Sequence, residues 1–422
     1  MNKFTLLLLL FSQLVFGQNT EPILSLEYCY TEAISNYPLI KQKDLLKTST
    51  EYKIKNLNVN YLPQVFLNGQ ATYQSDVTEL PIKMPGVSIP ELNKDAYKVT
   101  LDVNQVVYDG GLTKNQKNIE KTGLLLDEQN LDIELYKVKD RVNQLYFNIL
   151  LLQENEKLLK VMQNEINSKL AKMEAAIKGG VAIENNANIL KAELIKIEQQ
   201  LIEINAGKQA SSQMLGELIN KTITEKTTFV LPEPIVNVND TINNRLEFKY
   251  FDLQKDKITQ TKNLSFSKIM PRVSVFGQAG YGRPGLNMFT TTFDTYYLVG
   301  AKLSWNIWNW NQSKNEKNIL NIQSSIVDSQ KELFAMNLKM ANYKENADVK
   351  KFIALIEKDN EIIALKTKIA KNASYQLDNG IITATEYTTE LNSEWQAKLN
   401  LELHKIQLVL SKINYLNNLG ML

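Results

Sequence analysis

The strongest constraint on the fold of this chain is a unit that occurs twice in its sequence. The segment at 114–119, Lys-Asn-Gln-Lys-Asn-Ile, recurs 200 residues later at 314–319 as Lys-Asn-Glu-Lys-Asn-Ile. Further upstream the offset is 208 residues, since Leu-Pro-Gln-Val at 62–65 corresponds to Met-Pro-Arg-Val at 270–273. Two offsets that differ by one insertion indicate a duplication, with the longer loop in the first copy. The fold must therefore have two similar halves.

The duplication divides the chain into three parts after its N-terminus. The first copy covers 18–226 and the second covers 241–422. Between them, residues 227–240 contain Leu-Pro-Glu-Pro and have the composition of a linker. Charges nearly cancel, with 48 Lys and Arg against 46 Asp and Glu, which argues against nucleic acid as a partner.

The first 17 residues have the pattern of a secretory signal peptide. Lys3 gives a positive start, residues 4–16 are almost all apolar, and small Gly17 suits a cleavage site. The apolar stretch is too short to cross a bilayer as a stable helix. We therefore expect an exported protein whose mature chain begins near Gln18.

Each copy contains two stretches in which apolar and polar residues alternate. The four expected strands cover about 64–74, 97–107, 272–281 and 297–307. In the first of them one face carries only small or apolar residues, namely Val65, Leu67, Gly69, Ala71 and Tyr73. Such alternation is typical of a membrane β-barrel with a polar interior. A half-buried sheet in a soluble protein gives the same pattern, so the alternation alone leaves both open.

Features around the strands favour the membrane. The connections 75–96 and 282–295 are long enough to be outer loops of a barrel. Aromatic residues gather where strands end, as they do at membrane interfaces: Tyr108, Trp305, Trp308 and Trp310. After the signal no 18-residue apolar run occurs, so entry into a bilayer would have to use strands. We expect outer-membrane lipid to contact them.

The longest feature of each copy is a proline-free stretch that follows its second strand. Residues 112–178 place apolar side chains at alternating spacings of four and three, at Leu131, Leu135, Val138, Val142, Leu145, Ile149 and Leu152. This is a heptad seam, and its 67 residues would form a helix of about 100 Å. Gly179-Gly180 ends it, and a return helix is expected at 183–218.

The second copy repeats this plan with a long helix at 312–378 and a return helix at 383–419. Its seam is less regular, because polar residues interrupt it at Asn342, Glu345, Asp359 and Lys366. The fold class is thus a mixed α+β membrane protein with long coiled-coil hairpins and four strands per chain. Four strands cannot close a barrel, and an open sheet in lipid leaves unsatisfied edges, so the chain must assemble with copies of itself.

These features together resemble the TolC-like outer-membrane efflux family along nearly the whole mature chain. The resemblance rests on the duplicated plan, on Tyr108-Asp109-Gly110-Gly111, and on two helical tips, Gly179-Gly180-Val181-Ala182-Ile183 and Asn379-Gly380-Ile381-Ile382-Thr383. It implies a homotrimer with a 12-stranded barrel and an α-helical periplasmic tunnel, in the outer membrane of a Gram-negative bacterium. It also implies tips that dock on a periplasmic adaptor tied to an inner-membrane pump, with Gly179, Gly180, Val181, Asn379, Gly380 and Ile381 as docking residues.

The resemblance further implies an acidic gate just after the second tip. Glu386 stands where the family commonly has its first gate carboxylate, whereas the second such position is Thr389, with Glu390 beside it. Thr383, Glu386 and Glu390 share one helix face by their spacing. The family's basic gate partner is replaced by Ile382 here. The alternative is that Glu386 and Glu390 belong to a solvated acidic face.

Other classes of function find little support in the sequence. The chain has one histidine, His404, one cysteine, Cys29, and no hydrolase, phosphate-loop or zinc-protease motif, so we expect no enzyme, cofactor or metal site. An exported coiled-coil scaffold would explain the helices but not the repeated alternating strands. Within the channel class, efflux of small toxic compounds and type I protein secretion both remain open.

Overall fold

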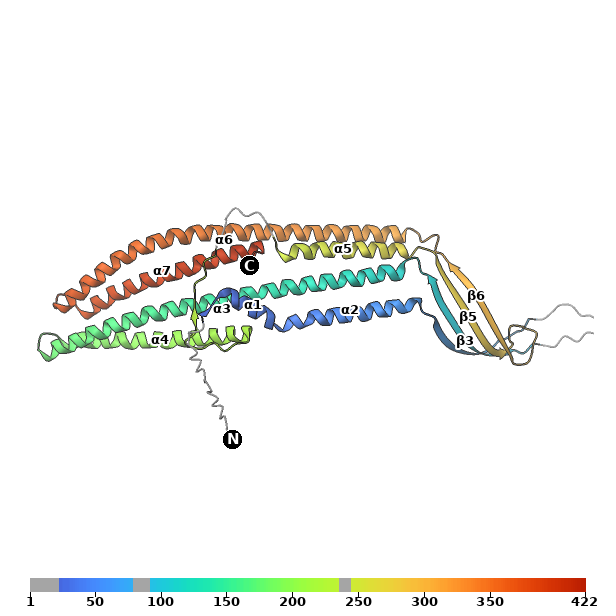
Figure 1. Ribbon diagram of the computed structural model, residues 1–422, viewed down its shortest axis with the longest axis horizontal. Helices are drawn as coiled ribbons and strands as arrows, with labels where there is room; N and C mark the ends of the chain where they lie inside the picture. The colour runs from blue at the N-terminus through green and yellow to red at the C-terminus, as the bar shows by residue number, and fades with distance from the viewer. Residues whose placement is uncertain (1–22, 79–91, 235–243) are drawn as a thin grey trace, which may run out of the picture.

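The computed structural model describes residues 23–78, 92–234 and 244–422, and it is strongly elongated (Figure 1). Helices run side by side over most of its length, and a β-sheet lies at one end. The expected signal peptide, the middle of the first outer loop and residues 235–240 of the expected linker lie outside the described residues.

Seven α-helices form the described helical part. Their bounds are α1 Leu26–Asn36, α2 Gln42–Asn58, α3 Leu112–Lys178, α4 Glu184–Ile219, α5 Leu246–Ser267, α6 Gln312–Asp378 and α7 Ala384–Leu419. Short 3-10 turns at Pro38–Lys41 and Val59–Tyr61 flank α2. The long helices α3 and α6 each have 67 residues, or about 100 Å, and cover the ranges expected from the sequence. The return helices begin one residue later than expected, because Ile183 and Thr383 are their N-caps.

Four long antiparallel strands form one sheet in the order β2-β3-β5-β6. They are β2 Gln64–Tyr73, β3 Asp95–Tyr108, β5 Arg272–Arg283 and β6 Asp294–Ser304. Two further short strands, β1 Ile23–Leu24 and β4 Thr228–Phe229, pair in parallel beside the helices.

The last strand of the single chain differs from its expected range of about 297–307. β6 instead begins at Asp294 and ends at Ser304, opposite Arg272, the first residue of β5. Pro271 precedes Arg272 and has no N–H to donate, so β5 offers no further ladder. Trp305 leaves the sheet and donates its ring N–H to the carbonyl of Ile269 at 3.1 Å.

The apolar face of the sheet is open to solvent in the single chain. Leu67, Tyr297 and Val299 have exposed fractions of 75%, 77% and 73%. No helix of the described chain covers this face, and the sheet continues beyond the helical bundle (Figure 1). The sheet is therefore not half-buried against the described part of its own chain. Large exposed apolar patches mark interaction surfaces.

No helix in the described part of the chain is both long and apolar enough to cross a bilayer.

The helical part has two hydrophobic cores. One lies where α1, α3, α4 and α7 meet the small β1–β4 pair, around Cys29, Tyr146 and Leu215, all with 0% exposure. The Tyr146 hydroxyl lies 2.7 Å from the carbonyl oxygen of Val230. Burial raises the pKa of the Cys29 thiol to about 12, as suits an inert core residue.

The second core follows the expected seam toward the helical tips. Leu159 and Ile166 of α3 are fully buried there against Leu190 and Ile197 of α4. In the other hairpin, two of the polar interruptions are buried as well. Asp359 lies 2.6 Å from the Nδ1 atom of His404, so the single histidine serves the packing of α6 against α7.

The duplication is visible in the strand register. Gln64 lies opposite Asn104 in the β2–β3 pair, and Arg272 lies opposite Ser304 in the β5–β6 pair. These pairs are related by the offsets found in the sequence, 208 for the first strand and 200 for the second. Each copy therefore forms the same β-hairpin.

The junctions between strand and long helix repeat in the same way. In the first copy Gln105 donates to the carbonyl of Tyr61 at 3.4 Å, as Trp305 does to that of Ile269 in the second. Asp109 accepts from the N–H groups of Gly111 and Thr113, at 2.9 and 2.7 Å. These contacts hold the start of α3, and its cap residue Gly111 has a left-handed backbone.

Candidate functional site: the paired helical tips

Both helical hairpins turn through the same backbone motif at their tips. Gly180 and Gly380 have φ values of +73° and +71°, a region that favours glycine. In the first tip the N–H of Gly180 donates to Ile177 and that of Val181 donates to Ala176, each at 3.0 Å. The second tip repeats both bonds 200 residues later, at 3.0 and 2.8 Å. This double bond pattern is a Schellman motif.

The tips end in exposed apolar side chains. Val181 is 81% exposed and Ile381 is 70% exposed, each directly after its left-handed glycine. No described atom lies within 4 Å of a Cβ placed on either glycine, so the backbone conformation rather than crowding requires glycine there. The expected docking residues thus form two matching protrusions.

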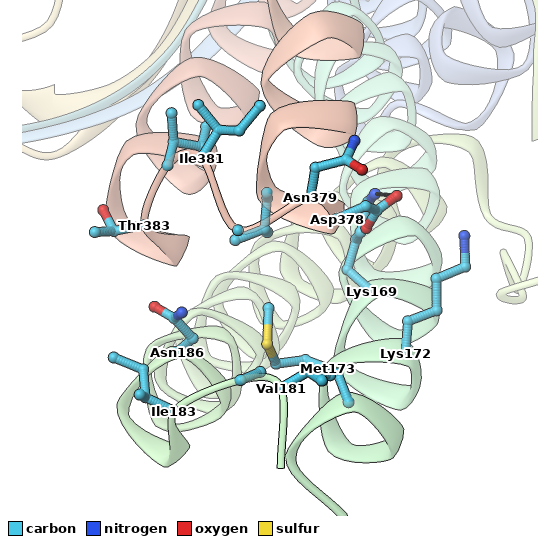
Figure 2. Close-up of a pocket in the computed structure, with 15 residues that line it drawn as sticks. Lys169, Lys172, Met173, Val181, Ile183, Asn186, Asp378, Asn379, Ile381 and Thr383 are labelled. Atoms are coloured by element: carbon cyan, nitrogen blue, oxygen red, sulfur yellow. Dashed lines mark hydrogen bonds and ion pairs between the residues drawn. The ribbon is translucent and has the colours of Figure 1, made fainter. Parts of the chain in front are cut away.

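A cleft of about 720 Å³ separates the two tips. Lys169, Lys172 and Met173 of α3 line it from one side, and residues 377–383 line it from the other. Figure 2 shows the apolar residues Val181, Ile183 and Ile381 beside this cleft, together with the charged pair Lys169 and Asp378. The cleft therefore combines apolar tip residues with one ion pair.

The pair Lys169–Asp378 joins the two hairpins. The ammonium of Lys169 lies 2.7 Å from the Asp378 carboxylate and donates to the carbonyl of Ser374 at 3.0 Å. Its side chain is only 8% exposed, whereas that of Asp378 is 34% exposed. A nearly buried ammonium requires such partners, because an uncompensated charge is costly to bury.

A second link lies one turn further from the tips. The Tyr387 hydroxyl of α7 donates to the Glu165 carboxylate of α3 at 3.0 Å, and Tyr387 is fully buried. Burial raises the pKa of Tyr387, and the nearby Glu165 charge raises it further, so the phenol stays protonated and remains a donor. The Lys169 ammonium lies 5.7 Å from the same ring, in cation–π range.

The return helices are linked as well. Asn186 accepts a hydrogen bond from the N–H of Ala384 at 3.2 Å, and Asn392 donates to Glu193 at 3.0 Å. Both contacts connect α4 with α7. The two tips are thereby held together by polar contacts on both helices of each hairpin.

The expected gate residues do not act as one group in the single chain. Glu386 forms a capping box with Thr383: its carboxylate accepts from the Thr383 N–H at 2.8 Å, and its own N–H donates to the Thr383 hydroxyl at 3.3 Å. The backbone hydrogen bond from Thr383 lowers the pKa of Glu386, with a smaller contribution from its hydroxyl. Both residues are exposed.

Glu390 and Thr389 have other partners. The Glu390 carboxylate lies 3.2 Å from the ammonium of Lys366 on α6, and Thr389 donates to the carbonyl of Thr385 at 2.8 Å. Lys366, which interrupts the heptad seam, thus provides a basic partner at the level of the acidic residues. The structure brings Thr383 and Glu386 together but directs Glu390 toward the other helix of its own hairpin.

Sequence reasoning missed several of these contacts. The spacing Thr-x-x-Glu at 383–386 is the signature of a capping box and could have identified the Thr383–Glu386 pair. Lys169 and Asp378 are 209 residues apart, and no local pattern pairs them. Among the described residues, no group of three metal-ligating side chains occurs.

The polar face of the sheet forms a second concentration of hydrogen-bonding groups. Asp102 at its centre accepts from the amide of Asn68 at 2.6 Å and from the hydroxyl of Thr100 at 2.8 Å. Gln278 on the next strand also donates to it. A cavity of about 1000 Å³ lies against this face and reaches down to Asp109 and Thr113 at the start of α3. The polar face and the helical part are thus continuous.

Comparison with solved structures identifies the fold. The outer membrane protein VceC of Vibrio cholerae is 14% identical, with 94% of this chain and 96% of that chain covered and a TM-score of 0.68. The Campylobacter jejuni outer membrane channel CmeC is 14% identical, with 94% and 85% covered and a TM-score of 0.67.

The open state of the Neisseria gonorrhoeae outer membrane channel MtrE is 13% identical, with 94% of this chain and 88% of that chain covered and a TM-score of 0.66. No protein-family model matches the chain, and no curated protein is significantly similar in sequence. The TolC-like fold expected from the sequence is therefore confirmed, from β-hairpins to helical tips.

Proposed function

We propose that this chain, which has the fold of TolC-like outer-membrane channels, is the channel subunit of a tripartite export system in a Gram-negative bacterium. It would conduct cargo from an inner-membrane pump through the periplasm and the outer membrane. The observation that carries the proposal is the exposed alternating sheet, continued at one end by helices of about 100 Å. Such a shape conducts rather than catalyses.

The proposed assembly is a homotrimer. Four strands are too few to close a barrel, and the edges β2 and β6 have no strand partner within the described chain. In lipid each unsatisfied backbone group costs several kcal/mol, so the edges must be paired. Three copies would supply twelve strands, with the polar face around Asp102 turned to the lumen and the apolar face to lipid.

The proposed partner of the tips is a periplasmic adaptor. Two matching protrusions with exposed Val181 and Ile381 support this proposal, because exposed apolar residues beside polar ones mark protein contacts. Three Glu386 and three Glu390 side chains per trimer would face the closed end of the tunnel as an acidic gate. Like charges at such a constriction attract cations.

Fractionation and electrophysiology test the proposal. The full-length protein should be recovered from outer membranes as a heat-sensitive trimer and should form ion-conducting channels in planar bilayers. A soluble monomer that forms no channels would instead favour an exported coiled-coil scaffold. Susceptibility of a deletion strain to toxic compounds, compared with its protein secretion, would then separate drug efflux from type I secretion as the cargo class.

A further inference from the structure

The unpaired strand edges of this chain have a partner that the duplication specifies. We infer that β6 of one copy pairs antiparallel with β2 of a second copy, with Ala301 opposite Ala71 of the neighbouring copy. The inference rests on the proposed assembly. Beyond that assembly, it specifies a strand register, an extension of β6 on assembly, and a contact made by Trp310.

The register follows from the pairing of β3 with β5, which joins the two repeats within one chain. There Leu101 lies opposite Ala279. The counterpart of Leu101 is Ala301, at an offset of 200, and that of Ala279 is Ala71, at an offset of 208. Since both offsets hold for the β2–β3 and β5–β6 pairs, repeating the β3–β5 contact between copies fixes the intermolecular register.

This register matches the faces of the two strands. Val299 would lie opposite Tyr73, and Leu303 opposite Gly69, which keeps the apolar residues of both strands on one face. A slip by one residue would place apolar side chains beside polar ones, because successive side chains alternate between faces. The alternation of the sequence therefore supports the register that the duplication gives.

The same pairing would lengthen β6. In the first copy β3 continues to Tyr108, and its last residue is paired with Val273 of β5 across a local irregularity. The counterparts are Trp308, which lies four residues beyond the end of β6, and Val65 of the neighbouring β2. In the single chain β6 ends at Ser304, where its only partner begins. The neighbouring copy thus provides the partner with which residues 305–308 become strand.

Trp310 has an unusual backbone conformation at this junction. Trp310 and Asn311 have φ values of +52° and +63°, where the first copy has Gly110 and Gly111 at +72° and +83°. A bulky residue rarely adopts this conformation, because its Cβ approaches the following carbonyl oxygen. Trp310 nevertheless is 82% exposed in the single chain, where its described ring contact is with the neighbouring Trp308, at 5.9 Å between ring centroids.

The in-chain junction indicates what Trp310 would touch. A Cβ on Gly110 would lie 2.5 Å from the Cβ of Met270, too close for any side chain. The counterpart of Met270 is Leu62, which is 56% exposed. Trp310 therefore packs on Leu62 of the neighbouring copy, in a junction that is wider than the one inside the chain. The junctions between copies, which contain Trp310, are therefore wider than the junctions inside each chain, which contain Gly110.

Disulfide cross-linking in isolated outer membranes tests the register. The variant that carries Ala71→Cys and Ala301→Cys should oxidise to covalent oligomers up to the closed ring. The control with Gly69→Cys and Ala301→Cys, shifted by two residues, should react at least about tenfold more slowly, because disulfides tolerate only short Cβ separations. Cys29 is fully buried and does not compete for the oxidant.

Two further variants keep the test decisive. Leu101→Cys with Ala279→Cys reports the same pairing inside one chain and must oxidise. Gly69→Cys with Leu303→Cys repeats the proposed register at another position. Oligomers that form through the shifted pair, or an in-chain control that oxidises while both proposed pairs stay reduced, would overturn the register. Specific cross-linking without any channel activity would contradict the proposed function and leave the pairing intact.

Maleimide labelling tests the Trp310 contact. Leu62→Cys should react several-fold more slowly in the oligomer than in detergent-dissociated monomers, and Trp310→Gly should restore much of the rate. Val181→Cys at the distant tip is the matched exposed control and should not respond to Trp310→Gly. If Leu62→Cys in the oligomer is labelled at the same rate with Trp310 and with Trp310→Gly, the proposed contact is contradicted.

Discussion

The two helical tips have nearly the same backbone and different side-chain supports. Gly180 and Gly380 turn the chain through equal left-handed conformations, and the flanking hydrogen bonds repeat. The second return helix is capped by Thr383 and Glu386, whereas Ile183 caps the first without a side-chain hydrogen bond among the described residues. Both copies thus keep the same turn, whereas the capping of the helix that follows the turn differs between them.

The turn, and not the cap, is the part of a tip that both copies require. The turn is needed in both copies because two long antiparallel helices must be joined over a few residues. The cap and the acidic residues after it occur only in the second copy, since Asn186 and Leu190 stand at the positions equivalent to Glu386 and Glu390. If the tips share a docking role, the glycines should matter equally, and the second copy should matter more for gating.

The largest expected effect concerns the tip glycines. Gly180→Val and Gly380→Val each force a β-branched residue to positive φ, at about 1–2 kcal/mol, and distort the apolar protrusion beside it. Each variant should reduce export to the level of a deletion strain while trimers remain intact on gels. Gly123→Ala, within the regular part of α3, is the control. Normal export by either valine variant would show that the tips do not share the docking role.

The link between the hairpins should have the next largest effect. Asp378→Ala leaves the ammonium of Lys169 nearly buried with only the Ser374 carbonyl as hydrogen-bond acceptor. Because Asp378 is partly exposed, the loss is about 1–3 kcal/mol rather than that of a fully buried pair. Amide hydrogen exchange at the second tip should quicken by roughly 5- to 150-fold. Glu357→Ala, an exposed site on the same helix, should leave the exchange unchanged.

The acidic residues should affect conduction more than stability. Replacing Glu386 and Glu390 together by Ala should raise single-channel conductance or weaken block by multivalent cations in planar bilayers, because two rings of negative charge are lost. Glu198→Ala, an exposed residue of the first return helix, is the matched control. If the double variant has unchanged conductance and unchanged cation block, both residues are surface charges without a role in gating.

The caps should have a smaller effect, of opposite sign in the two tips. Thr383→Ala should destabilise the first turn of α7 by about 1 kcal/mol, and Ile183→Thr should stabilise that of α4 by about 0.5–1 kcal/mol. Hydrogen exchange of the first-turn amides measures both. If Ile183→Thr leaves the exchange rates of these amides unchanged, the missing side-chain hydrogen bond at Ile183 does not weaken the first turn of α4.

The pH dependence of the second cap should be the smallest effect. The pKa of Glu386 is lowered in the folded chain, so its contribution is present above the ordinary carboxyl pKa and is lost as the pH falls through the folded value. Wild type and Glu386→Gln should therefore differ in first-turn protection at neutral pH and converge in acid. A difference that grows toward acid would contradict the capping role.

Much of the fold could be predicted because its signals are local and periodic. The ranges of α3 and α6 follow from the absence of proline, the heptad spacing and the glycine-containing turns. The sheet order needs only the two hairpins and the duplication. The end of β6 could not be predicted, because a strand ends where its partner ends, and Pro271 in the neighbouring strand sets that limit.

The candidate site was predicted less completely than the fold. The tips were found because glycine has a specific role at positive φ. Glu386 was identified as an acidic residue, but its capping role was not, although the Thr-x-x-Glu spacing at 383–386 is the signature of a capping box. Tyr387 and Glu165 were not found, since they lie 222 residues apart and meet only when the hairpins pack.

Local patterns in the sequence are sufficient for two β-hairpins, two helical hairpins of about 100 Å and their glycine turns, because backbone periodicity and turn chemistry act over a few residues. Which charged side chains meet depends instead on how the helices pack. Lys169 pairs with Asp378, and Glu390 with Lys366, because the packing of apolar seams sets the rotation and offset of each helix. Side chains far apart in sequence find their partners only after that packing has placed them.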